Sequence, residues 1–144
     1  MIAVDTNLLV YAHRADSEWH AQALRALVSL AEERSQWSIP WPCAHEFLAI
    51  VTHPRIYLPA STPEEALGSL AVWLETPNCV PIGEGPGYLD VLVRLVSTGR
   101  AIGGMIHDAR VAAVCIHNGI SVLWTADRDF GRFSELKTLN PLVT

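Results

Sequence analysis

The sequence predicts an α/β fold, with a central, mainly parallel β-sheet of four to five short strands flanked by helices on both faces. Short apolar runs alternate along the chain with longer segments of helical periodicity. Strands separated by helices need crossover connections, which favour parallel pairing. Half of the 144 residues are hydrophobic, and no linker or low-complexity segment interrupts them. We therefore expect a single domain over residues 1–144.

The first elements are predicted from an apolar run and from helix-capping residues. Residues 2–4 are typical of a short buried strand. Thr6 or Asn7 is expected to cap the helix that follows this strand. Ser17 is expected to cap a second helix, whose apolar positions keep helical spacing to about Arg34.

The middle of the chain predicts one strand and two helices. The strand covers residues 37–39 and is followed by a helix that opens at Pro42 and continues to about residue 52. The next helix begins at the segment Thr62 to Glu65, which has the sequence of a capping box with proline at the first helical position.

The last part of the chain predicts three short strands and two helices. Residues 80–82 form the third strand, and a helix with an apolar face over residues 89–96 follows it. A second helix over residues 105–117 ends at an Asn-Gly pair, which suits a left-handed stop. It leads to a fourth strand at residues 121–124, and residues 137–139 are expected to be an edge strand.

Composition excludes some classes of protein. The chain carries 15 acidic and 10 basic residues, a formal net charge of −5, so blanket positive charge is not available for binding nucleic acid. No run approaches the ~20 apolar residues of a membrane span, and no signal peptide is visible, so we expect a cytoplasmic protein with no membrane partner. Three cysteines without a C-x-x-C pair predict buried, reduced thiols.

Four acids lie where an isolated charge is costly. Asp5 and Asp127 follow the first and fourth predicted strands, at the edge of a parallel sheet where functional residues collect. Glu46 and Asp108 lie in otherwise apolar helical stretches. Carboxylates that converge without matching Lys or Arg repel one another unless a divalent cation lies between them, and oxygen ligands suit Mg²⁺ or Mn²⁺. Together the four acids favour a metal site.

Single acids also have ordinary structural explanations. Asp5 can cap the first helix, and Asp108 can be a favourable charge at a helix N-terminus. Asp127 and Asp129 can be solvated loop acids. Glu46 is harder to explain in this way, because its neighbours are apolar. The pair His45-Glu46 is not a zinc-protease motif, since the second histidine of H-E-x-x-H is missing.

Four segments, in this order and spacing, resemble the signatures of PIN-domain ribonucleases, and among these most nearly the VapC-type toxins of bacterial toxin–antitoxin systems. The resemblance covers essentially the whole chain. Its segments are Asp-Thr-Asn-Leu-Leu at 5–9, Pro42 to Leu48, His-Asp-Ala at 107–109 with Ala112 and Ala113, and Leu123 to Phe130.

The resemblance implies a catalytic quartet and a reaction. The quartet is Asp5, Glu46, Asp108 and Asp127, with Asp129 as a fifth candidate and Thr125 as a polar neighbour. Asp5 and Asp108 are expected to be the most direct metal ligands. The implied activity is Mg²⁺- or Mn²⁺-dependent endonucleolytic cleavage of structured RNA, such as tRNA or rRNA, which blocks translation. The implied assembly is a toxin homodimer that forms a hetero-oligomer with a cognate VapB-type antitoxin, which covers the site.

Two other functions stay open at this point. The first is a noncatalytic module of the same fold, whose acids serve protein interaction. The second is a small-molecule phosphatase acting through Asp5, against which Asn7 argues because it stands where such enzymes carry a general acid. If the quartet and Asp129 form one site, the remaining chain has ten acids against ten bases. The net negative charge is then a property of the site alone.

Overall fold

The computed structural model describes residues 1–143 and contains a five-stranded sheet in which every pair of neighbouring strands is parallel. The strand order is β3-β2-β1-β4-β5. The strands are β1 (Ile2–Val4), β2 (Trp37–Pro40), β3 (Cys79–Ile82), β4 (Val122–Trp124) and β5 (Thr138–Leu139). The chain builds outward from β1 on one side and then on the other, so the topological switch point lies between β1 and β4. The predicted fold class is confirmed.

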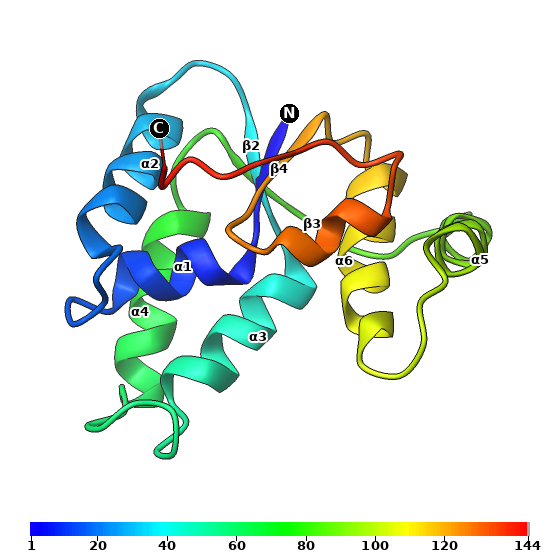
Figure 1. Ribbon diagram of the computed structural model, residues 1–144. Helices are drawn as coiled ribbons and strands as arrows, with labels where there is room; N and C mark the ends of the chain where they lie inside the picture. The colour runs from blue at the N-terminus through cyan, green and yellow to red at the C-terminus, as the bar shows by residue number, and fades with distance from the viewer. Residues whose placement is uncertain (144) are drawn as a thin grey trace.

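Helices cover both faces of the sheet, as Figure 1 shows. They are α1 (Thr6–His13), α2 (His20–Glu32), α3 (Trp41–Val51), α4 (Pro63–Leu74), α5 (Tyr88–Gly99), α6 (Met105–His117) and the 3₁₀ helix η1 (Arg128–Arg132). One buried cluster joins the sheet to α1, α2, α3 and α4, and a second joins it to α5, α6 and η1. Neighbouring residues of β1 belong to different clusters, because strand side chains alternate between the two faces of a sheet. Val4 packs in the first cluster and Ala3 packs in the second.

The N-termini of the helices show which capping residues could be predicted from the local sequence. The capping box at α4 is confirmed, since Thr62 Oγ1 accepts from Glu65 N at 3.1 Å and Glu65 Oε1 accepts from Thr62 N at 2.9 Å. The expected caps at Thr6 or Asn7 and at Ser17 are wrong, whereas the alternative that Asp5 caps the first helix is confirmed. Asp5, still extended, caps α1 through Thr6 N at 2.8 Å. Helix α2 starts only at His20, because Ser17 Oγ accepts from Trp19 N within the preceding turn.

The segment after β4 differs from the polar loop expected there. Residues 128–132 form the short helix η1, and Asp127 caps it, its Oδ1 accepting from Asp129 N at 2.8 Å. The three cysteines are free and buried, as predicted. Within residues 1–143, no helix combines the length and apolarity needed to cross a bilayer.

Candidate metal centre

The four predicted acids meet in one cavity at the carboxyl edge of the sheet. This acidic cavity has a volume of about 240 Å³, and Asp5, Glu46, Asp108 and Asp127 all line it. Asp5 and Asp127 arrive from β1 and β4, which pair in parallel and end together. Asp5 N donates to Trp124 O at 2.9 Å, which continues this pairing to the start of the cavity. Glu46 comes from α3, and Asp108 comes from the first turn of α6.

Asp5 is the most buried of these acids, with 5% of its surface exposed. Its Oδ1 accepts from Thr6 N at 2.8 Å and from Cys43 Sγ at 3.4 Å. Its Oδ2 accepts from Thr125 Oγ1 at 2.7 Å and from Asn7 Nδ2 at 3.4 Å. Burial raises the pKa of Asp5, and the bonds from Thr125 and Thr6 oppose that rise. Asp5 therefore caps a helix and also presents a fixed carboxylate to the cavity.

Thr125 links the residues that follow β1 and β4 through hydrogen bonds of its hydroxyl. Its hydroxyl donates to Asp5 and accepts from Asp127 N at 2.9 Å. Asn7 adds a second link, since its Oδ1 accepts from the backbone N–H of Ala126 at 3.2 Å. These bonds set the spacing between the two acids that follow the strands. The predicted polar neighbour Thr125 thus lies directly between two members of the quartet.

Three carboxylates form a tighter group within this region. Asp108, Asp127 and Asp129 each offer one ligand atom, and these atoms lie within 4.8 Å of one another. We call them the aspartate triad. Across residues 1–143, none of the Arg–carboxylate ion pairs involves the triad. Asp5 lines the same cavity but lies outside the triad, so the ligand pair Asp5 and Asp108 stays a prediction. The structure brings Asp129, the fifth candidate, close to Asp108 and Asp127.

The carboxylates influence one another electrostatically. Partial burial raises the pKa of Asp108, and the negative charges of Asp127 and Asp5 raise it further, whereas Arg132 lowers it. Glu46 shows the same pattern, because partial desolvation raises its pKa first and the charges of Asp5 and Asp108 add to the rise. Uncompensated carboxylate oxygens held this close are a donor set that fits a hard divalent cation.

A second hollow opens beside the acidic cavity. This side groove, of about 570 Å³, shares Glu46 and Asp108 with the cavity and is also lined by His45, His107 and Arg110. Its histidine and arginine side chains contrast with the carboxylates next to them. The acids therefore lie where an acidic hollow and a more basic one meet.

Sequence reasoning did not find every residue of the cavity. Cys43, expected only as a small buried side chain, donates to Asp5. Tyr11 and Tyr57 line the acidic cavity and were not singled out. Tyr57 lies between α3 and α4 in a segment without hydrophobic periodicity, so no local pattern indicates where it lies. Tyr11 lies on α1, and the sequence does not show which side of this helix faces the cavity.

Comparisons with known proteins find relatives over nearly the whole chain. A family model described as the PIN domain matches residues 2–136, which include every acid of the cavity and the triad. The VapC ribonuclease Mb2897 of Mycobacterium bovis is 33% identical over 142 residues, covering 99% of this chain and 96% of that protein.

Two solved structures share the fold. VapBC2 from Rickettsia felis, bound to a DNA fragment from their promoter, matches with a TM-score of 0.71 at 20% identity, covering 97% of this chain and 98% of that one. VapC20 of Mycobacterium tuberculosis, a sarcin-ricin loop cleaving toxin, matches with a TM-score of 0.64 at 17% identity, covering 91% and 93%.

Proposed function

The chain belongs to the PIN-domain family, and from this premise we propose that it is a VapC-type endoribonuclease toxin neutralised by a cognate VapB-type antitoxin. The observation that carries the proposal is the meeting of Asp5, Glu46, Asp108 and Asp127 in one cavity at the switch point of a parallel sheet. Helix capping accounts for Asp5 and Asp127 one at a time. It does not account for the convergence of four acids, since converging carboxylates destabilise a protein in the absence of a cation.

We infer that the site takes Mg²⁺, with Mn²⁺ as an alternative. Asp108 and Asp127 would hold the ion, together with Asp129 or with the buried Asp5. When bound, such a cation supplies neutralisation of the charge that builds on a phosphodiester during attack by water. The donor set supports this choice, since it consists of carboxylate oxygens without a paired arginine.

The protein's own residues have separate roles in this proposal. Asp5 is oriented by four donors and keeps its carboxylate in one direction. Glu46 lines the cavity and has a raised pKa, which brings it nearer to the range where a carboxylate accepts a proton from an attacking water. Asp127, fixed through its backbone by Thr125, orients the same water. In-line attack leaves a 5′-phosphate and a 3′-hydroxyl.

The proposed substrate is structured RNA such as tRNA or rRNA. The side groove gives the RNA backbone a path away from the carboxylates, because His45, His107 and Arg110 line it. Arg110 pairs with Glu84 at 2.6 Å and would exchange this partner for a phosphate. With a net charge of −5, metal-free binding of RNA is expected to be weak.

Matched substitutions test the proposal. Asp108 and Asp90 both lie in the first turn of a helix, but Asp90 is exposed on α5 and lines neither hollow. Purified Asp108→Asn and Asp5→Asn should fold and lose RNA cleavage in Mg²⁺, whereas Asp90→Asn should cleave like the wild type. EDTA should abolish wild-type cleavage. Cleavage that is undiminished in both site variants would contradict the proposal, and a wild type that does not cleave RNA in Mg²⁺ would favour a noncatalytic module.

Partner binding needs its own measurement. We propose a homodimer that binds the antitoxin as a hetero-oligomer, with the antitoxin covering the acidic cavity. Light scattering of the chain alone and with the protein encoded by the adjacent upstream reading frame measures both assemblies. A strictly monomeric chain, or a complex that still cleaves RNA at the wild-type rate, would contradict this assembly.

A further inference from the structure

The acidic cavity has a second, apolar end. Besides the carboxylates, it is lined by Val10, Tyr11, Ile50 and Tyr57. Ile50 lies one helical turn beyond Glu46 on α3, and Tyr11 lies about 7.5 Å beyond Thr6 along the axis of α1. Helices α1 and α3 pack against each other. The cavity lining therefore changes from carboxylates to aromatic and aliphatic side chains over about 6–7.5 Å along the axes of these two helices.

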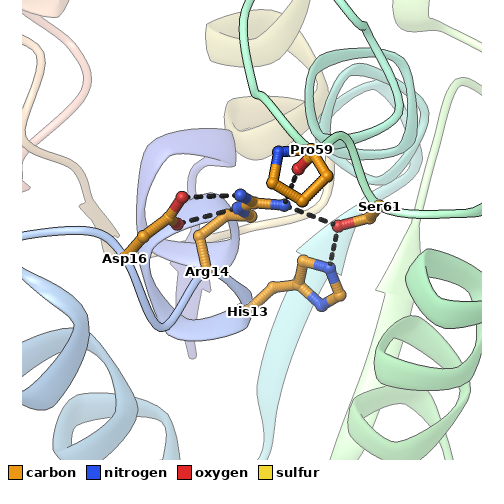
Figure 2. Close-up of polar contacts among 5 residues, drawn as sticks. All are labelled: His13, Arg14, Asp16, Pro59 and Ser61. Atoms are coloured by element: carbon orange, nitrogen blue, oxygen red, sulfur yellow. Dashed lines mark hydrogen bonds and ion pairs between the residues drawn. The ribbon is translucent and has the colours of Figure 1, made fainter.

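Tyr57 is held at this end by Arg14. The Arg14 guanidinium lies 4.3 Å from the centre of the Tyr57 ring, a cation–π arrangement. Arg14 is itself fixed, because Asp16 accepts from its Nε at 2.9 Å and from its NH2 at 2.6 Å. Its NH1 donates to Pro59 O at 3.1 Å and to Ser61 Oγ at 3.2 Å (Figure 2).

The segment that carries Tyr57 is attached to the protein at further points. Ser61 Oγ is hydrogen-bonded to His13 Nε2 at 2.8 Å, as Figure 2 shows, and Ser61 N donates to Val51 O at 2.8 Å. Tyr57 N donates to His53 O at 3.1 Å. Ser61 is buried, and Tyr57 is half-buried. The Tyr57 ring thus lines the cavity in a fixed position, and that position depends on the contact with Arg14.

We propose that Tyr11 and Tyr57 form a subsite for one unpaired RNA base next to the bond that is cut. This inference rests on the proposed function and adds a requirement to it. Single-stranded RNA is recognised by stacking of unstacked bases on aromatic side chains. Such stacking is sequence-tolerant and contributes about 1–3 kcal/mol per base. The cavity of about 240 Å³ has room for one base beside the carboxylates. Because a base must leave its stack to lie on these rings, the subsite favours cleavage at unpaired positions.

The subsite assigns different roles to its residues. Tyr57 and Tyr11 bind substrate and take no part in proton transfer. Arg14 is a positioning residue, because it contacts the Tyr57 ring, Asp16, Pro59 and Ser61 and does not line the acidic cavity. Loss of the Tyr57 ring, or of the Arg14 guanidinium that positions it, should therefore raise KM for RNA more than it lowers kcat.

The test begins with the cut that the wild-type chain makes in total RNA in Mg²⁺. A short fluorescein-labelled RNA carrying that cut is then prepared in three forms: unmodified, and with an abasic ribose on the 5′ or the 3′ side of the cut. KM and kcat are measured for the wild type, Tyr57→Ala, Tyr57→Leu, Tyr57→Phe and Arg14→Gln. Tyr88→Ala is the matched control, since Tyr88 packs against His117 and lines neither hollow.

The expected result is an increase in KM of about 5- to 150-fold for Tyr57→Ala, which is the stacking contribution expressed as a ratio. Tyr57→Leu should lose nearly as much although it keeps the bulk, and Tyr57→Phe should recover most of the loss. Arg14→Gln should raise KM less. One of the two abasic RNAs should raise the KM of the wild type by a similar factor. With the same abasic RNA, Tyr57→Ala should raise KM no further, which shows that the base and the ring act together.

Other outcomes overturn the subsite. These are unchanged KM for both Tyr57→Ala and Tyr57→Leu, or independent, multiplicative losses from the ring and the base. Weaker antitoxin binding with unchanged KM for RNA would assign the apolar end to the antitoxin instead. Wild-type cleavage without a Tyr57 effect rejects the subsite alone, whereas absence of wild-type cleavage rejects the proposed function and the subsite with it.

Discussion

Asp108→Asn should make the metal-free protein more stable while removing its response to metal. The substitution keeps the size of the side chain and removes one charge from the aspartate triad. In the metal-free protein, Asp108 lies near Asp127 and Asp129 without a paired arginine. Removing its charge relieves this repulsion. It also removes a favourable charge from the first turn of α6, so the two effects must be compared.

The magnitudes favour stabilisation. Two unit charges 4.8 Å apart repel by about 1 kcal/mol at the dielectric constant of water and by about 3.5 kcal/mol at an effective value of 20. Because Asp129 is exposed and Asp108 half-buried, we use the lower figure. Relief of two such pairs is about 2 kcal/mol, and the lost helix-terminal interaction is about 0.3–1 kcal/mol. The net gain of about 1 kcal/mol corresponds to a rise in Tm of about 3 °C for a domain of this size.

Thermal unfolding in EDTA and in Mg²⁺ measures both parts. In EDTA, Asp108→Asn should melt above the wild type. In Mg²⁺ at 100 times its Kd, the wild type should gain about 2.7 kcal/mol, and the variant should gain much less, so the order reverses. Asp90→Asn is the control, because it removes a first-turn charge from α5 without relieving triad repulsion. It should melt at or slightly below the wild type in both solutions and keep the full gain from Mg²⁺.

Two results would refute this reasoning. If Asp108→Asn melts below the wild type in EDTA by more than Asp90→Asn does, Asp108 is stabilised by interactions other than those described. If Mg²⁺ stabilises Asp108→Asn as much as the wild type, Asp108 is not a ligand.

Three further predictions concern the surroundings of the site and the core. Thr125→Val removes the hydroxyl that donates to buried Asp5 and should lower the free energy of unfolding by about 1–3 kcal/mol, measured by urea denaturation. The pKa of Asp5 is raised in the folded chain, so its protonated form contributes stability below about pH 4 that is lost as pH rises through the raised value. In EDTA, the unfolding free energy of the wild type relative to Asp5→Asn should therefore fall as the pH rises above about 4, and a rising difference would contradict the assignment. Gly99→Ala places a Cβ 2.6 Å from the Phe133 ring and should cost about 1–3 kcal/mol. Gly68→Ala meets nothing within 4 Å inside α4 and should add about 0.5–1 kcal/mol, so equal effects of the two alanines would show that packing at Gly99 is misjudged.

Local sequence was sufficient where the decisive interaction is local. Apolar periodicity located the strands and helices, because each element buries a face set by its own repeat. The capping box of α4 involves backbone and side-chain atoms only three residues apart and was predicted correctly. The cap of α2 was not, and for α1 the observed cap Asp5 was only an alternative to Thr6 or Asn7. The direction in which the chain leaves β1 makes Asp5 rather than Thr6 the last extended residue, and the turn at Ser17 postpones the second helix.

The sequence by itself predicted the fold class and the four acids that line the acidic cavity, because isolated charges stand out at strand ends and in apolar helices. Only the tertiary structure decided that Asp129 joins Asp108 and Asp127 at close range while Asp5 lies outside their triad. It also brought Tyr57 to the acidic cavity through Arg14, a residue 43 positions earlier in the chain. Such contacts join segments with no shared local pattern, and their distances follow from how α1, α3 and the sheet pack together.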